Sequence, residues 1–293
     1  MKINYLNTAL IALTLFSCGS INNKQIDYQT ISPENSSEYT NKATEKAKQL
    51  LSENKFTPFE TLQIQKLENT EKNSNVLLHT NNEPLQKSGN EIYNHLKERT
   101  MYVGTSYMCN KCPNMHLSNA SGFVIHEDGV MVTNYHVIDG KEDFKISAVF
   151  ATDHEGNVYP VSKILSASKS NDLAILQLDT QGKKLKSLEL AEEELVGEDV
   201  YVMGHPFNLT FFMGKGIISR KYVKSSTTRI SITADYGVGA SGGPVVNNFG
   251  QIVGVVSSTR THYSNGSKAN GDVQMVTKEV IPVSMLNNYI NKG

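Results

Sequence analysis

The sequence predicts an all-β domain, a sandwich or barrel, in the part of the chain from about residue 98 to the end. After Met101 the chain consists of short runs rich in Val, Ile, Tyr and Thr, which Gly, Asp and Asn interrupt. Many short strands with turn signals between them are typical of sandwiches and barrels. Glu127-Asp128-Gly129 lies between two apolar runs and indicates a hairpin, because glycine tolerates the positive φ of tight turns.

Nine segments of this part have the length and composition of strands, and one segment near the end favours a helix. The predicted strands are residues 102–103, 122–125, 130–133, 144–150, 173–178, 200–203, 216–218, 229–233 and 252–257, and the predicted closing helix is 281–290. No internal repeat of fixed period is present. The domain is therefore expected to close with a helix after its last strand.

The chain begins with a segment typical of export. Met1-Lys2 supplies a positive charge, residues 9–16 are almost entirely apolar, and Ser17 is a small residue before Cys18. This pattern predicts a signal peptide over residues 1–17, too short for a membrane-spanning helix. Residues 15–18 also resemble the lipobox of bacterial lipoproteins, in which the cysteine after the cleavage site becomes lipid-modified. The alternative is an ordinary secretory signal followed by an unmodified Cys18.

Residues 18–97 are predicted to form a lipid-anchored spacer, partly helical or disordered, that holds the rest of the chain away from a membrane. The segment is rich in Asn, Ser, Lys, Glu and Gln, and its apolar residues are sparse. A helix is expected over residues 44–51, and Asn90-Glu91 is expected to cap another helix that runs through Ile92 and Leu96. Residues 69–84 between them have the composition of a tether.

The totals indicate a globular protein and argue against several classes. The chain has 293 residues and a mass of 32.4 kDa, with 39% hydrophobic and 8% aromatic residues, which fits neither a wholly disordered chain nor a polytopic membrane protein. Its 28 Lys and Arg residues nearly balance 29 Asp and Glu residues, for a net charge of -1. No global field therefore favours binding to nucleic acid.

Three segments supply the residue types of a nucleophilic hydrolase. His136 follows a predicted strand, Asp172 precedes another, and Ser241 lies in a glycine-rich loop before a third apolar run. A serine hydroxyl is a weak nucleophile, so a histidine must accept its proton and an acid must orient that histidine. Glycines beside the serine allow backbone N–H groups to stabilise an oxyanion. The three residues are therefore candidates for a catalytic triad.

Four sequence blocks resemble the signatures of the trypsin-like (chymotrypsin-fold) serine peptidases, and most closely those of the HtrA/Deg-like branch. They are Ser-Gly-Phe-Val-Ile at 121–125, Thr-Asn-Tyr-His-Val-Ile at 133–138, Asn-Asp-Leu-Ala-Ile-Leu at 171–176 and Gly-Ala-Ser-Gly-Gly-Pro-Val at 239–245. The resemblance spans residues 98–293 and implies two six-stranded antiparallel β-barrels with the active site between them. It implies that His136 is the general base, Asp172 the orienting acid and Ser241 the nucleophile, with the N–H groups of Gly239 and Ser241 as the oxyanion hole.

The sequence departs from family patterns in three respects. Ala240 stands where many trypsin-like zymogens have an aspartate that pairs with a new N-terminus, so activation by that ion pair is not expected. The residues after Ser241 are expected to be too few for the PDZ domain that HtrA proteins usually carry. The mature chain also has few cysteines.

Apart from Cys18, the chain has two cysteines, Cys109 and Cys112, which lie in the sequence Cys-Asn-Lys-Cys-Pro. A disulfide between Cys109 and Cys112 is the first interpretation, because oxidising compartments favour disulfides. The alternative is a metal site with His116, for which no fourth ligand is evident. We assign no metal-binding residues.

Asp235 and Ser257 are assigned to substrate binding. Asp235 lies six residues before Ser241, where the resemblance places the floor of the primary specificity pocket, and an acid there favours Lys or Arg beside the cleaved bond. If the alignment contains a one-residue gap, Asp235 corresponds instead to an aspartate that has a structural role in the HtrA branch. Members of that branch prefer small aliphatic residues beside the cleaved bond. Both alignments are compatible with the sequence.

The sequence therefore predicts an exported serine endopeptidase of the bacterial cell envelope, anchored by lipid at Cys18 on a periplasmic or surface face. Its expected partners are protein or peptide substrates and a membrane, with no nucleic acid and no cofactor. The alternative is a catalytically silent binding lipoprotein on the same scaffold, or a structural lipoprotein. The sequence does not indicate an oligomeric state.

Overall fold

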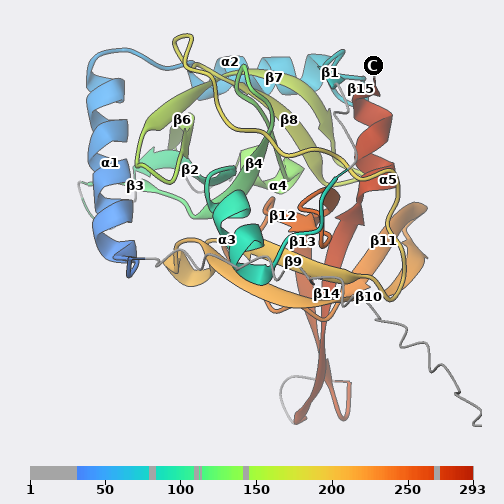
Figure 1. Cartoon of the computed structure of the whole chain (residues 1–293). Helices are drawn as coiled ribbons and strands as arrows, with labels where there is room; N and C mark the ends of the chain where they lie inside the picture. The colour runs from blue at the N-terminus through green and yellow to red at the C-terminus, as the bar shows by residue number, and fades with distance from the viewer. Residues whose placement is uncertain are drawn as a thin grey trace, which may run out of the picture. The chain divides into compact units, whose positions relative to one another are not determined.

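Two six-stranded β-barrels form most of the structure, a computed structural model that describes residues 32–78, 84–108, 112, 114–140, 145–266 and 271–292 (Figure 1). The first ring is β2 (Thr100–Met108), β4 (Ala120–His126), β5 (Val130–Thr133), β8 (Leu173–Leu178), β7 (Val158–Ser168) and β6 (Lys145–Thr152), closed by pairing of β2 with β6. A short strand, β3 (Met115–Leu117), pairs with the end of β2. The prediction of two antiparallel six-stranded barrels is confirmed.

The second barrel is built from the strands between residues 199 and 282. Around the ring they are β9 (Asp199–Gly204), β10 (Phe212–Lys224), β11 (Thr227–Ile232), β14 (Val273–Pro282), β13 (Ile252–Tyr263) and β12 (Pro244–Val246), and every neighbouring pair is antiparallel. The outer parts of β13 and β14 continue beyond the barrel as a two-stranded ribbon, visible at the bottom of Figure 1.

Each barrel has its own apolar core, and a further apolar cluster contains residues from both barrels. Along β4, Val124 points into the core of the first barrel, whereas its neighbours Phe123 and Ile125 belong to a second cluster with Met203 and Val255 of the other barrel. Alternate residues of a strand face opposite sides of the sheet, so β4 is buried on both faces. The shared cluster holds the two barrels in a fixed relation, which a site built from both requires.

Three helices precede the barrels: α1 (Ser36–Ser52), α2 (Phe59–Glu68) and α3 (Gly89–Lys97). Ser32–Gly293 form one compact unit. Leu62 of α2 lies in the core of the first barrel, and Ile92 and Leu96 of α3 lie in the shared cluster. The apolar residues of this segment are few, and several of them lie on the helix faces that meet the barrels, whereas Ile64 and Leu67 of α2 are exposed. The domain boundary expected at residues 97 and 98 stays a prediction.

The ends of these helices differ from the sequence-based expectation. Helix α1 begins at Ser36 because Asn35 accepts a hydrogen bond from the N–H of Glu38 at 3.1 Å. The cap of α3 is Ser88 and not Asn90, because Ser88 and Glu91 form a reciprocal capping box. The helical character of both segments was predicted correctly.

The end of the described chain contains a shorter helix than predicted. Strand β14 runs as far as Pro282, and the helix is confined to α5 (Val283–Leu286), followed by the 3-10 turn η2 (Asn287–Tyr289). After η2, β15 (Asn291–Lys292) pairs in parallel with β1 (Leu77–Leu78).

The predicted signal peptide and Cys18 lie outside the described residues. Among the helices that the structure describes, none has the length and apolar character needed to cross a membrane.

Candidate active site

His136 lies on α4 (Tyr135–Ile138), a helical turn directly after β5. Its imidazole Nδ1 is 2.9 Å from Oδ1 and 3.0 Å from Oδ2 of Asp172, and its backbone N–H donates to Oδ1 at 3.1 Å. Since an acceptor faces Nδ1, the neutral ring keeps its proton there and leaves Nε2 free to accept one. The half-exposed side chain therefore has the orientation of a general base.

Asp172 lies in the turn between β7 and β8, at a φ of +58°. Its carboxylate accepts from His136 and also from Ser257 Oγ, at 2.8 Å to Oδ2. Its backbone carbonyl accepts from Asn134 Nδ2 at 3.0 Å. Contacts from β13 and from the residue before α4 thus fix an acid in a backbone conformation that non-glycine residues rarely adopt.

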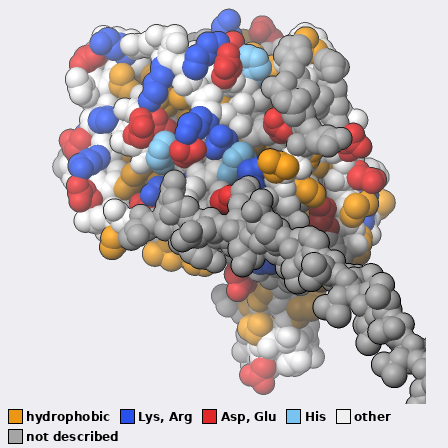
Figure 2. All heavy atoms as spheres, in the orientation of Figure 1, with side chains coloured by type: hydrophobic (Ala, Val, Ile, Leu, Met, Phe, Trp, Pro, Cys, Tyr) orange, Lys and Arg blue, Asp and Glu red, His pale blue; other side chains and the backbone are white. Residues whose placement is uncertain are grey.

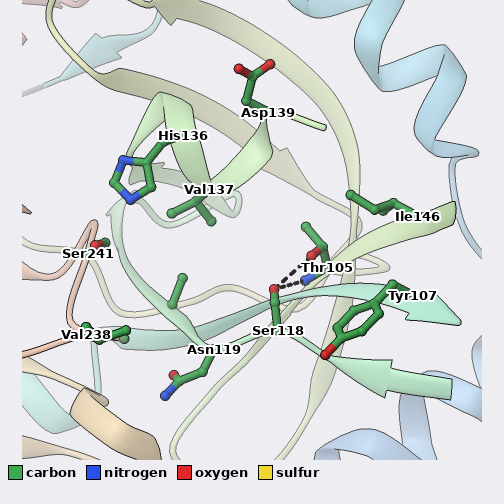
Figure 3. Close-up of a pocket in the computed structure, with 12 residues that line it drawn as sticks. Thr105, Tyr107, Ser118, Asn119, His136, Val137, Asp139, Ile146, Val238 and Ser241 are labelled. Carbon is green, nitrogen blue, oxygen red and sulfur yellow. Dashed lines mark hydrogen bonds between the residues drawn. The ribbon is translucent and has the colours of Figure 1, made fainter. Parts of the chain in front are cut away.

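Ser241 comes from the other barrel, in the loop between β11 and β12. Its hydroxyl donates to the carbonyl of Ser257 at 3.3 Å, and within the described residues no hydrogen bond joins it to His136. Ser241 and His136 nevertheless line the same pocket (Figure 3). Hydrogen bonds of a catalytic site are often loose without substrate and tighten when substrate binds.

The backbone beside Ser241 has two N–H donors without an acceptor. Among the described residues, the N–H groups of Gly239 and Ser241 form no hydrogen bond, whereas those of Ala240, Gly242 and Gly243 do. The carbonyl of Val238 accepts from the N–H of Phe207 at 2.7 Å. Because C=O and N–H point in opposite directions in a trans peptide, this bond orients the N–H of Gly239.

Glycine is required at position 239 by the backbone and by its neighbours. Its φ is +101°, and a Cβ there would lie 2.5 Å from the carbonyl oxygen of His205 and from Nδ2 of Asn119. The Asn119 amide itself donates to that carbonyl at 2.8 Å. A side chain at position 239 would therefore displace the loop that presents the two free N–H groups.

Ser121 connects the first barrel to this loop, a role that the sequence analysis did not assign. Its N–H donates to the carbonyl of Ser241 at 2.8 Å, its hydroxyl donates to the carbonyl of Gly239 at 2.8 Å, and the same hydroxyl accepts from the N–H of His205 at 3.1 Å. Ser121 is fully buried. Its place in the first signature block was a signal, but only the structure shows which groups it contacts.

The pocket has a volume of about 320 Å³ and a mainly apolar lining. Tyr107, Val137 and Ile146 of the first barrel and Val238 of the second contribute apolar surface, and His136 and Ser241 lie at one end (Figure 3). Apolar pockets with a few polar groups are typical of binding sites. This pocket therefore offers space for a side chain next to the reactive groups.

The two residues assigned to substrate binding differ in position. Ser257 is part of the site, but its hydroxyl binds Asp172 and its carbonyl accepts from Ser241. The side chain of Asp235 is 86% exposed, lies 3.5 Å from Lys278 Nζ, and does not line the pocket. The structure thus does not bring Asp235 together with the other candidates.

The cysteine loop is only partly described, because Cys109 lies outside the described residues. Cys112 Sγ is 3.0 Å from Nε2 of His116. Across the parts of the chain that the structure describes, no group of three or more His, Cys, Asp or Glu side chains is arranged to hold a metal ion. The disulfide between Cys109 and Cys112 stays a prediction.

Charge is mixed on the face of the molecule that Figure 2 draws. Lys and Arg side chains are interspersed with Asp and Glu side chains on the face drawn in Figure 2, in agreement with the net charge of -1.

Burial lowers the pKa of His205 to about 3, so this histidine is neutral near pH 7. Its Nδ1 accepts from the N–H of Phe211 at 3.2 Å, a structural role.

Comparison with known proteins agrees with this arrangement. Residues 120–255 match the family described as trypsin-like peptidase domain. The chain is 31% identical over 147 residues to "Protease Do-like 1, chloroplastic" from Arabidopsis thaliana, covering 47% of this chain and 32% of that protein. It is 32% identical over 154 residues to a "Probable periplasmic serine endoprotease DegP-like" from Pseudomonas savastanoi, covering 49% and 30%.

A third relative is "Serine protease HTRA1" from Xenopus laevis, 31% identical over 147 residues, with 47% of this chain and 31% of the relative covered. The chain thus spans about a third of the length of each of these relatives. Fold and matches agree: residues 120–255 are similar to the trypsin-like peptidase domain, and the chain resembles the HtrA and DegP serine proteases.

Proposed function

We propose that this chain is a serine endopeptidase that uses His136, Asp172 and Ser241. One observation carries the proposal. The imidazole of His136 is bound to Asp172 through Nδ1, and it shares a pocket with Ser241, beside which the N–H groups of Gly239 and Ser241 have no acceptor among the described residues. A base, a nucleophile and two donors at one pocket are the groups that acyl transfer needs.

In the proposed reaction, Ser241 Oγ attacks the scissile carbonyl carbon while its proton passes to His136 Nε2. The two free N–H groups stabilise the oxyanion, and Asp172 stabilises the imidazolium. The imidazolium then protonates the leaving amine as the C–N bond breaks, which leaves an acyl-enzyme. Water, deprotonated by His136, attacks this ester and releases the second product and the serine hydroxyl.

The site supports selection of uncharged residues beside the cleaved bond. Asp235 is exposed to solvent and lies beside Lys278, so its charge does not face a substrate side chain in the pocket. The surface that lines the pocket is mainly apolar, and Asp139 contributes a carboxylate to it. These observations favour the alignment in which Asp235 is not a specificity residue and small aliphatic residues are preferred.

Export and a lipid anchor at Cys18 belong to the same proposal and rest on the sequence of residues 1–18. A relative from Pseudomonas is named a periplasmic endoprotease. Mass spectrometry of the N-terminal peptide from a bacterial host tests the anchor. A diacylglycerol-modified Cys18 is expected, and an unmodified N-terminus at another position would leave only an ordinary secretory signal.

Labelling with a fluorophosphonate probe tests the enzyme proposal. We expect the wild-type chain to be labelled, Ser241→Ala to lose all labelling, and Ser225→Ala, which changes an exposed serine in the β10–β11 turn, to behave as wild type. Cleavage of a peptide library then reports residue preference. Absence of labelling in the folded wild-type chain, or labelling that persists in Ser241→Ala, would support the silent binding protein instead.

A further inference from the structure

The helical turn that carries His136 is too short to hold itself in place. Helix α4 has four residues, and the side chain of its N-cap, Asn134, makes no capping hydrogen bond. Isolated helices of this length are unstable, since nucleation is costly and few hydrogen bonds form. The position of His136 therefore depends on what packs around α4.

Helix α2 supplies polar contacts to the end of α4. Gln63 Nε2 donates to the carbonyl of Ile138 at 2.9 Å, and the Lys66 ammonium forms an ion pair with Asp139, the residue after α4. The same ammonium lies 4.9 Å from the centre of the Tyr135 ring. Side chains from one face of α2 thus hold both ends of the turn.

Lys66 is a buried charge, with only 5% of the residue exposed. A buried ammonium is stable only when paired, because burial removes its hydration. Asp139 is that partner, and its carboxylate points away from the imidazole of His136 (Figure 3). The pair therefore acts on His136 through the backbone of α4, not by direct contact with the ring.

Apolar packing supports the same contact. Phe59 and Leu62 of α2 and Ile138 of α4 belong to one core cluster of the first barrel. The ring of Phe59 also lies 3.4 Å from the position of a Cβ on Gly140. Helix α2 is thus packed beneath α4 as well as bonded to it.

Glu71, shortly after α2, holds the turn that carries Asp172. Its carboxylate accepts from the hydroxyls of Tyr289 at 2.8 Å, Ser168 at 2.8 Å and Ser170 at 3.2 Å. The Tyr289 hydroxyl accepts from Asn171 Nδ2 at 2.8 Å. Asn171 directly precedes Asp172, so Glu71 and Tyr289 fix the start of the catalytic turn.

Both partners of the His136–Asp172 bond are therefore supported by one segment, residues 59–71, which lies before the region matched by the peptidase family, residues 120–255. We propose that Lys66 and Glu71 are positioning residues, which set the geometry of His136 and Asp172 from outside the peptidase domain match. This inference rests on the proposed peptidase function, because that function gives the geometry its catalytic effect.

The Lys66–Asp139 pair is tested with Lys66→Met, Asp139→Asn and the double variant in the full chain. We expect each single variant to lower kcat about tenfold, since a small misplacement of a catalytic group slows chemistry more than binding. Lys66→Met should leave KM unchanged within about twofold, because Lys66 does not line the pocket, whereas Asp139 does. The double variant is expected to be no slower than either single variant, because both remove one interaction. Lys66→Arg should recover most of kcat.

A matched control separates positioning from loss of charge or stability. Lys48→Met removes the exposed Lys48–Glu45 ion pair of α1 and should leave kcat unchanged. Rates are measured well below the unfolding midpoint of each variant, with circular dichroism as a check of folding. An unchanged kcat in folded Lys66→Met, or a rise in KM alone, would refute the role of Lys66.

The role of Glu71 is tested with Tyr289→Phe, which removes the hydroxyl that donates to the Glu71 carboxylate and keeps the ring. Its control is Tyr159→Phe, which removes a hydroxyl bound to Asp153 at 2.8 Å in the first barrel. We expect a fall in kcat of about threefold or more in Tyr289→Phe, by the same argument, and none in Tyr159→Phe. Equal effects of the two variants would refute the role of Glu71.

Hydrogen exchange distinguishes failure of this inference from failure of the peptidase proposal. If the wild-type chain is not labelled by the fluorophosphonate probe, the peptidase proposal fails by itself. The positioning contact is still tested, because the N–H groups of His136 and Val137 should exchange faster in Lys66→Met than in Lys48→Met. Equal exchange rates would show that α2 does not hold α4.

Discussion

Ser121→Ala tests how the loop around Ser241 is held in its working conformation. The side chain of Ser121 bonds two backbone groups at once, the carbonyl of Gly239 at 2.8 Å and the N–H of His205 at 3.1 Å. Alanine removes both bonds without adding bulk. The N–H groups of Gly239 and Ser241, the proposed oxyanion donors, lie in the peptides on either side of the Gly239 carbonyl, so their orientation is expected to loosen.

The size of the effect follows from the groups that lose a partner. Each buried backbone group left without a hydrogen bond costs about 1–3 kcal/mol, so loss of both bonds is expected to lower the free energy of unfolding by about 2–6 kcal/mol. Loss of a complete oxyanion donor lowers kcat by about 10²–10³. Loosening both donors without removing either should lower kcat by about tenfold.

Ser106→Ala is the matched control, because Ser106 is also a fully buried serine of the first barrel that bonds two backbone groups. Its hydroxyl donates to the carbonyl of Ala148 at 3.2 Å and accepts from the N–H of Ala148 at 3.0 Å. Urea unfolding should show similar losses in the two variants, whereas the rate of fluorophosphonate labelling should fall only in Ser121→Ala. Equal labelling rates in both folded variants would refute the reasoning.

Two further predictions concern groups near the site. Burial lowers the pKa of His205 to about 3, so the unfolded chain binds this proton below about pH 6.5 and the folded chain does not. The free energy of unfolding should therefore fall as the pH decreases from about 6.5 to 3, by up to about 1.4 kcal/mol per pH unit. Urea titrations of His205→Gln should show a shallower fall with pH, and parallel curves for the variant and the wild-type chain would contradict this prediction. Asp235→Asn, in contrast, should change neither kcat/KM nor the preferred residue in a peptide library, because its side chain is exposed; a loss of cleavage after Lys or Arg in this variant would restore Asp235 as a specificity residue.

Several of the strands that the sequence predicted are rich in apolar residues over their whole length. Residues 173–178 coincide with β8, and residues 122–125 and 200–203 lie within β4 and β9. Strands β7 and β14 were missed. Pro160 within β7 argues against a strand, and Lys278 and Glu279 interrupt the apolar pattern of β14. Their pairing with neighbouring strands decides their conformation, and that pairing is not a local property.

Two of the three helices before the barrels, α1 and α3, were predicted as helices but not as parts of the packed structure, and α2 was not predicted. Their apolar content is low, so composition favours a spacer. Composition does not show where those few apolar residues lie on each helix. Ala47, Leu62 and Leu96 are fully buried because each faces a barrel surface, and the sequence alone does not specify which surface a short helix meets.

The sequence by itself determined the barrel class, the order of the signature blocks and the candidates for the reactive side chains, because these depend on residue types and local patterns. Only the tertiary structure decided the contacts between distant segments: Ser257 on Asp172, Ser121 on Gly239, and the exposure of Asp235. The physical reason is that hydrogen bonds and burial act through space. Residues far apart in the chain become neighbours only when both barrels have closed.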